Sequence, residues 1–279
     1  MDKEILDERL VPLAEVQRIL EEREKIGDLN YTQRITLDHA HKFNKISVER
    51  AYTLINILTS EFNIHEGLAV QIVNIMPKHL DEIQPFFSGQ KVTGPKSNDE
   101  LVLILKTLME FVFSALIDQV TGLDEKKVIR LLLEKPRSVE ETIKALSLRG
   151  EGKEAKGKEI FALYLKNQLV ADLIVDHFLL PAQAVELTQK MPRTLKETQD
   201  IFGEALSEKD VGEVSNRVEL CRKIIGLTTD FQVPLSISQM VAESNPVSLE
   251  DLKKQLGAVG ESFTEDQLKA IQTTLSPQE

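Results

Sequence analysis

Residue types that could perform catalysis or bind a metal ion are few and scattered in this sequence of 279 residues. The segment 150–158, GEGKEAKGK, is rich in glycine, but it lacks the spacing of a phosphate-binding loop and the apolar strand before it, which favours a flexible loop. His39 and His41 stand two residues apart on a predicted helix, so their side chains point to different sides. The single cysteine, Cys221, lies among apolar residues, which favours a packed thiol over a nucleophile. We therefore expect no catalytic residue, no metal site and no cofactor.

One stretch has a charge opposite to that of the whole chain. From Asp124 to Lys158 there are ten Lys or Arg against seven Asp or Glu, whereas the chain has a net charge of −11. Such a stretch could follow RNA phosphates, although it lacks the interleaved aromatic residues that stack on bases. A mixed, solvated face is the alternative. The candidate RNA contacts are Lys126, Lys127, Arg130, Arg137, Lys153 and Lys156.

Four prolines mark an internal repeat. Pro136 follows Pro77 by 59 residues, Pro192 follows Pro136 by 56, and Pro246 follows Pro192 by 54. Each proline ends one short predicted helix and precedes another, and in the last three copies a Ser or Thr begins a capping box. The shared apolar positions lie five residues before the proline and three and ten residues after it, as in Ile72, Leu131, Leu187 and Val241, then Leu80, Val139, Leu195 and Leu249, then Phe87, Leu146, Phe202 and Leu256. We expect Leu195 and Leu249 to be buried.

The repeat predicts an all-α fold of four tandem units, each a long helix, a short helix, a proline turn and a second short helix. Stacked units of this size bury their apolar faces against their neighbours, so we expect an elongated array. Caps at Asn30 and Ser47 predict helices at 31–44 and 48–60, after a first helix at 13–24. Further helices are predicted at about 98–120, 158–176 and 264–275, and from 208 to either Gly226 or Thr229, with a linker at 90–98.

The composition and the N-terminal sequence exclude several classes of protein. Hydrophobic residues make up 42% of the chain and aromatic residues 5%, and tryptophan is absent, which suits a helical globular protein. The charged start, MDKEILDERL, lacks the apolar core of a signal peptide. The most apolar run, 101–120, is interrupted by charges and predicts a buried helix rather than a membrane span. We expect a cytoplasmic protein with no membrane contact.

Residues 8–89 resemble the F-type stalk subunit of archaeal DNA-directed RNA polymerase, the counterpart of the fourth subunit of eukaryotic polymerase II. The resemblance lies in ERLVPLAEVQRILEERE, GDLNYTQRITLDHAHKFNKIS and EGLAVQIVNIMPKHLDEIQPFF, in this order and spacing. It implies an HRDC-like helical domain and an E-type stalk partner. By that resemblance the partner-facing residues include Leu10, Val11, Leu13, Val16, Leu20 and Leu37.

The later copies resemble this family through the internal repeat alone. We therefore expect a domain like the F-type polymerase subunit at 1–95 and further HRDC-like repeats at 96–154, 155–206 and 207–279, the last with a capping helix. One hypothesis is a non-catalytic polymerase stalk subunit, which forms a heterodimer with the E-type stalk partner, supports initiation and contacts nascent RNA. The other is a stand-alone helical-repeat scaffold or transcription regulator derived from a duplicated F-type subunit.

Overall fold

Every regular element that the structure describes is a helix, so the predicted all-α class is confirmed. The structure is a computed structural model that describes residues 9–88, 94–95, 97–203 and 206–276. The chain divides into two compact units, Met1–Val112 and Phe113–Glu279, called unit 1 and unit 2 below. The predicted linker at 90–98 lies mostly outside the described residues.

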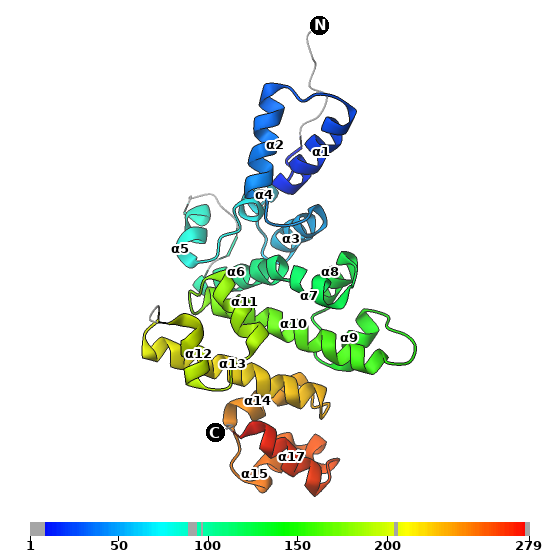
Figure 1. The fold of residues 1–279 in the computed structure, drawn as a ribbon, viewed down its shortest axis with the longest axis vertical. Helices are drawn as coiled ribbons and strands as arrows, with labels where there is room; N and C mark the ends of the chain where they lie inside the picture. The colour runs from blue at the N-terminus through cyan, green and yellow to red at the C-terminus, as the bar shows by residue number, and fades with distance from the viewer. Residues whose placement is uncertain (1–8, 89–93, 96, 204–205, 277–279) are drawn as a thin grey trace. The chain divides into compact units, whose positions relative to one another are not determined.

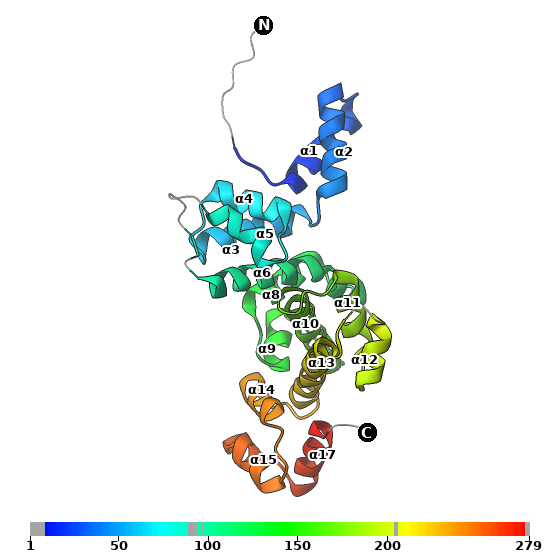
Figure 2. The same ribbon diagram turned by 90° about the vertical axis from the view of Figure 1, so that its left-hand side faces the viewer.

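Unit 1 begins with a hairpin of two helices whose caps follow the sequence prediction. Asn30 and Gln33 form the predicted capping box, with distances of 2.9 and 3.0 Å between side-chain oxygen and backbone nitrogen. Ser47 accepts a hydrogen bond from the backbone N–H of Arg50. α1 packs against α2 and α3, and α3 packs against α4 (Figures 1 and 2). The elements are α1 (Leu13–Ile26), α2 (Tyr31–Phe43), α3 (Val48–Ser60), α4 (Glu66–Ile75), α5 (Leu80–Ile83), the 3-10 helix η1 (Gln84–Phe87) and α6 (Asn98–Phe113), whose last residue belongs to unit 2.

Unit 2 is built around two long helices, α10 and α13, which pack against each other. α10 also contacts α9 and α11, and α13 also contacts α12, α14 and α17. The elements of unit 2 are α7 (Ala115–Thr121), α8 (Glu125–Glu134), α9 (Val139–Ala145), α10 (Lys153–Val175), α11 (Pro181–Lys190), α12 (Leu195–Phe202), α13 (Glu208–Thr229), α14 (Leu235–Ser244), α15 (Leu249–Leu256), α16 (Ala258–Glu261) and α17 (Glu265–Leu275).

The four proline turns have the same geometry. The helix before each proline, α4, α8, α11 or α14, has 10 residues and ends two residues before the proline. The residue directly before each proline adopts the left-handed conformation, which ends the helix and avoids the right-handed helical geometry that a following proline disfavours. These residues are Met76, Lys135, Met191 and Asn245, with φ of 52°, 44°, 45° and 46°. The prolines themselves are buried.

A second left-handed residue recurs where each of these short helices is about to begin. Fourteen residues before the prolines stand Asn63, Gly122, Phe178 and Gln232, with φ of 52°, 63°, 56° and 57°. Two left-handed turns at matching positions in all four copies show that the repeat seen in the sequence is also a repeat of backbone conformation. Its HRDC-like character and the four domain boundaries stay predictions.

In two of the predicted capping boxes after the prolines, the carboxylate accepts a hydrogen bond from a backbone N–H one residue earlier than expected. Ser138, Thr194 and Ser248 each accept a hydrogen bond from the N–H three residues on, at 3.1 Å, as predicted. The carboxylates of Glu141 and Glu197, however, accept from the N–H of the residue before the cap, at 2.6 and 2.7 Å. These bonds join the proline turn to the next helix as well as capping it.

The prediction that Leu195 is buried is wrong, because its side chain is 58% exposed in the first turn of α12. Leu249 is half-buried. Like the predicted apolar position five residues before the proline, the position six residues after it is fully buried in every copy; it is occupied by Ile83, Thr142, Thr198 and Leu252. Two of these are threonines, which an apolar pattern does not detect. Their hydroxyls donate to the carbonyl oxygens four residues earlier, at 3.0 and 3.1 Å, so that burial leaves no hydroxyl unpaired.

Two predicted segments differ from the structure. The helix predicted at 98–120 is divided at Ser114 into α6 and α7. The loop predicted at 150–158 ends at Gly152, and α10 begins at Lys153. Gly157 therefore lies inside α10. A Cβ at this position would be 2.5 Å from Cγ1 of Ile143, so the glycine permits α10 to approach α9 closely.

The C-terminal end of unit 2 has an apolar core of its own. We call this the C-terminal cluster. Its buried residues come from α13, α14, α15, α17 and the segment after α13, and half-buried residues such as Phe231 and Phe263 pack against them. The buried members are Leu227, Val233, Val241, Ala242, Leu252, Leu256, Leu268, Ile271 and Leu275.

Candidate protein-binding surface

Polar contacts hold the α1–α2 hairpin together. The side chain of Gln17 in α1 donates to Glu21 and accepts from Asn44, at 2.8 and 2.9 Å. Glu21 also contacts the ring of His41 in α2 at 2.9 Å. These bonds lower the pKa of Glu21, first through Gln17 and then through His41. These side-chain hydrogen bonds add to the apolar contacts between the two helices.

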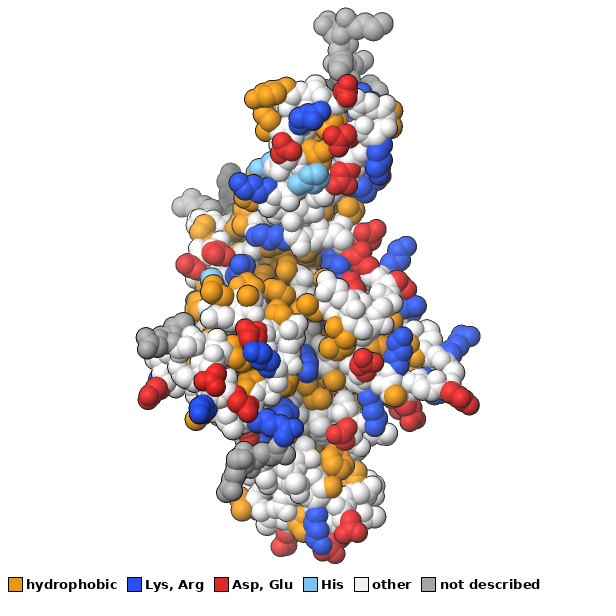
Figure 3. Space-filling model, in the orientation of Figure 1, with side chains coloured by type: hydrophobic (Ala, Val, Ile, Leu, Met, Phe, Trp, Pro, Cys, Tyr) orange, Lys and Arg blue, Asp and Glu red, His pale blue; other side chains and the backbone are white. Residues whose placement is uncertain are grey.

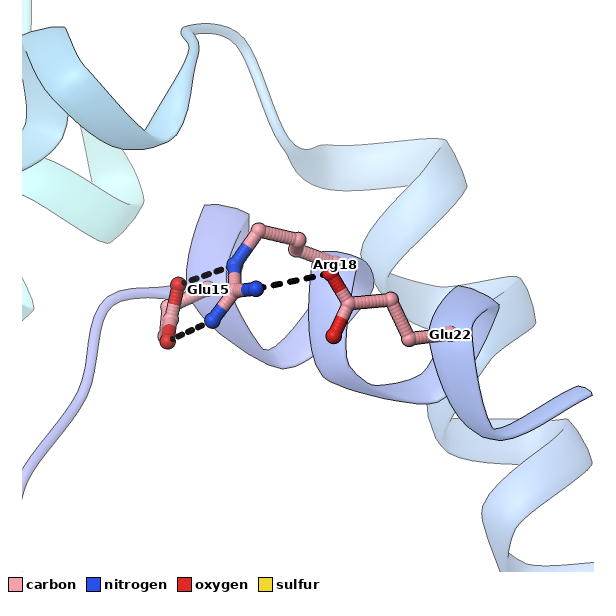
Figure 4. A network of polar contacts seen from close by, with 3 residues as sticks. All are labelled: Glu15, Arg18 and Glu22. Carbon is pink, nitrogen blue, oxygen red and sulfur yellow. Dashed lines mark hydrogen bonds and ion pairs between the residues drawn. The ribbon is translucent and has the colours of Figure 1, made fainter. Parts of the chain in front are cut away.

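A second set of polar contacts lies within α1 itself. Arg18 makes a two-pronged contact with Glu15, at 2.6 and 2.8 Å, and a third bond with Glu22 at 2.8 Å (Figure 4). The hydrogen bond from Arg18 holds the pKa of Glu15 below its ordinary value. Glu15 is buried, so this pairing stabilises a carboxylate that would otherwise be costly to remove from water.

The hairpin buries few apolar side chains. Among the described residues, α1 buries Ala14 and Glu15, and α2 buries Leu37 and Ala40. Large hydrophobic residues are instead exposed at its surface, where Figure 3 shows hydrophobic side chains. They are Leu10, Ile19, Ile26, Tyr31, Ile35 and Phe43, with exposures from 45% to 81%.

Three of these exposed residues are aligned along α2. Tyr31, Ile35 and Phe43 share a spacing of four residues with His39, so the four side chains follow one line on the helix, which we call the α2 stripe. The rings of His39 and Phe43 are 4.6 Å apart. Exposed apolar and aromatic residues grouped in this way are typical of a protein-binding surface.

The residues predicted to face a partner lie on this hairpin or just before it. Leu10 is 59% exposed and is free to contact another protein. Leu37 is 4% exposed and packs inside the hairpin, so most of its surface is already used. The remaining four, Val11, Leu13, Val16 and Leu20, are half-buried. Sequence reasoning overlooked the α2 stripe as a surface, although its four-residue spacing was visible.

The predicted RNA contacts are exposed in unit 2, and some are neutralised within their own helix. Lys127 pairs with Asp124 at 3.1 Å, and Arg130 pairs with Glu134 at 2.6 Å, all on or beside α8. Figure 3 shows Lys and Arg side chains interspersed with Asp and Glu on the side of unit 2 that carries α8 and α9. Lys126, Arg137, Lys153 and Lys156 complete the exposed set.

Other reactive groups are inert or isolated in the part of the chain that the structure describes. Burial raises the pKa of Cys221 to about 12, so its thiol stays protonated and is a poor nucleophile. Among the described residues of 9–276, which leave out the stated gaps, no group of three or more His, Cys, Asp or Glu could hold a metal ion. No helix in that part is both long and apolar enough to cross a membrane.

Comparison with known proteins places this hairpin within a matched region. Residues 4–112 match the family described as RNA polymerase Rpb4. A relative, the DNA-directed RNA polymerase subunit Rpo4 of Methanocaldococcus jannaschii, is 35% identical over 104 residues, which are 37% of this chain and 88% of the relative. The chain belongs to the RNA polymerase Rpb4 family. The resemblance to the archaeal F-type stalk subunit is thereby confirmed.

The Rpb4 match and unit 1 both end at residue 112. The Rpb4-family part therefore contains α1 to α5, η1 and nearly all of α6, together with the exposed apolar surface of the hairpin. Unit 2 lies outside this match and contains the last three proline turns.

Proposed function

We propose that this protein is a non-catalytic subunit of a DNA-directed RNA polymerase stalk, which supports transcription initiation and contacts nascent RNA. In this proposal its Rpb4-family part forms a heterodimer with an E-type stalk partner. The observation that supports a heterodimer most directly is the exposed apolar surface of a hairpin with little core of its own. A partner that covered this surface would bury residues such as Leu10 and Ile35, which are costly to leave in water.

The proposal assigns distinct roles to the two units. Leu10, Val11, Leu13, Val16 and Leu20 contact the partner, whereas Leu37 supports the hairpin from inside. The exposed basic residues of unit 2, Lys126, Lys127, Arg130, Arg137, Lys153 and Lys156, contact nascent RNA. Such a subunit works in the cytoplasm of an archaeal cell.

The test is co-expression with the E-type stalk partner of the same organism. We expect a heterodimer of one copy each in size-exclusion chromatography and a dissociation constant that Leu10→Asp or Ile35→Asp raises at least tenfold. Val247→Asp is the matched control, because Val247 is 88% exposed in unit 2 and should not affect pairing. Two soluble proteins that fail to associate would contradict the proposal.

A stand-alone scaffold or transcription regulator is the second candidate. It is favoured by unit 2, which has an apolar core of its own and lies beyond the family match. Polymerase purified from the native organism separates the two candidates. A stoichiometric amount of this chain supports the stalk subunit, whereas an F-type subunit of ordinary length in its place supports the regulator.

A further inference from the structure

A groove in unit 2 brings together lysines that are distant in the sequence. It has a volume of about 530 Å³ and lies between α9, the first turns of α10 and the end of α13 with the segment that follows. Lys144 comes from α9, and Lys153 and Lys158 come from α10. The wall is held in place by a backbone hydrogen bond of 3.3 Å from Leu235 to the carbonyl oxygen of Arg137, next to the groove.

The groove lysines differ in their pairing from Lys127 and Arg130 of α8. Lys127 and Arg130 each have a carboxylate of their own helix or its cap within 3.1 Å. Lys144, Lys153 and Lys158 make no ion pair with any described residue, although Glu140 and Glu154 also line the groove. The groove therefore keeps three cations available within a chain whose net charge is −11.

We propose that this groove binds the sugar–phosphate backbone of single-stranded RNA, with Lys144, Lys153 and Lys158 as its phosphate contacts. Lysine binds phosphate as a compact charge with three donors, and no aromatic residue lines the groove to stack on a base. Binding is thus independent of base sequence. The inference rests on the proposed function for the choice of RNA, and it places the main contact in the groove rather than on α8.

The test measures binding of a fluorescent 20-nucleotide oligouridine to the full-length chain by anisotropy at several salt concentrations. The groove variant carries Lys144→Gln, Lys153→Gln and Lys158→Gln. The control carries Lys196→Gln, Lys209→Gln and Lys269→Gln, which remove the same charge from exposed positions of unit 2 outside the groove and α8. We expect the groove variant to bind at least tenfold more weakly and to lower the salt slope by about 2, because each phosphate contact on a single strand contributes about 0.7.

The control variant should change affinity less than threefold. An equal loss in both variants would show that only the overall charge matters and would overturn the proposal, as would undetectable binding by the unchanged protein at 50 mM salt. A measurement on the unchanged protein guards against misfolding of the variant. RNA should protect Lys144, Lys153 and Lys158 from acetylation more than it protects Lys196, and equal protection would contradict the groove site. Pairing with the E-type stalk partner is measured separately, so either proposal can fail alone.

Discussion

The α1–α2 hairpin and the C-terminal cluster are both built from amphipathic helices, yet they bury very different shares of their apolar side chains. The two helices of the hairpin bury two residues each and expose Ile26 and Tyr31 to about 80%. The cluster buries nine apolar residues in one shared core. The cluster is complete within the chain, whereas the hairpin leaves an apolar surface exposed.

The difference also shows in how each region is held together. The cluster depends on apolar contact, which is strong and not directional. The hairpin depends on hydrogen bonds through Gln17, Glu21 and Asn44 and on the ion pairs of Arg18. Because polar contacts at a surface stabilise weakly, substitutions should affect the two regions very differently.

The largest expected effect is from a charge placed in the cluster. Ile271 is fully buried, so Ile271→Asp should destabilise the protein by about 3–5 kcal/mol, since an unpaired buried charge is costly. Ile26→Asp in the hairpin is the matched change at a residue 79% exposed, and it should shift stability by about 0.5 kcal/mol or less. Thermal unfolding followed by circular dichroism measures both. Equal shifts in the midpoint would remove the distinction between the regions.

A smaller effect should follow from adding one carbon to a closely packed helix of unit 2. Gly157→Ala should destabilise by about 1–3 kcal/mol, because the new Cβ meets Ile143. Gly212→Ala in α13 is the control, because no atom lies within 4 Å of its Cβ position. There alanine should stabilise the helix by up to about 1 kcal/mol. Denaturant unfolding of both variants measures the change in the free energy of unfolding. A change of the same sign in both would contradict the close packing of α9 and α10.

The two regions also carry matching caps. Asn30 begins α2 with a complete capping box, and Thr264 does the same for α17. Replacing either by Ala should cost about 1 kcal/mol locally. Thr264→Ala should lower the global unfolding midpoint, whereas Asn30→Ala should increase hydrogen exchange in the hairpin alone. A global change from Asn30→Ala would mean that the hairpin unfolds together with the rest of the chain.

The smallest expected effect is a loss of stability of α1 at low pH. Arg18 lowers the pKa of Glu15 in the folded hairpin, so this pair stabilises fully above the ordinary Glu pKa of 4.5 and loses its effect as the pH falls through the lowered folded value. The protection of α1 amides from hydrogen exchange, relative to the intrinsic exchange rate at each pH, should therefore decrease below about pH 4.5. Glu15→Gln should make the same helix less dependent on pH in that range. An identical pH profile in the variant would assign the acid response to another group.

Local signals in the sequence correctly predicted the residues at which several helices begin. Asn30, Ser47, Ser138, Thr194 and Ser248 cap helices as expected, because a cap depends on residues within one turn. The prolines predicted the turns for the same reason.

What depends on distant neighbours was harder to predict. Gly157 indicated a loop, although it serves a close approach between two helices. Leu195 and the α2 stripe have the spacing of buried residues, but periodicity does not say whether another element covers them. For the candidate surface, the partner-facing residues predicted from the sequence lie on or just before the same hairpin, and the prediction overlooked the exposed α2 stripe.

The left-handed residue before each proline has a consequence for how the length of this protein can change. Lys135 and Met191 have φ of 44° and 45°, each is followed by a buried proline, and each proline is followed by an arginine, Arg137 or Arg193. Removing residues 137–192 would therefore join Pro136 to Arg193. The chain would continue in the same direction, and the next helix would begin at the same distance after the proline. The loss or gain of one whole unit at this point would leave every remaining helix uninterrupted.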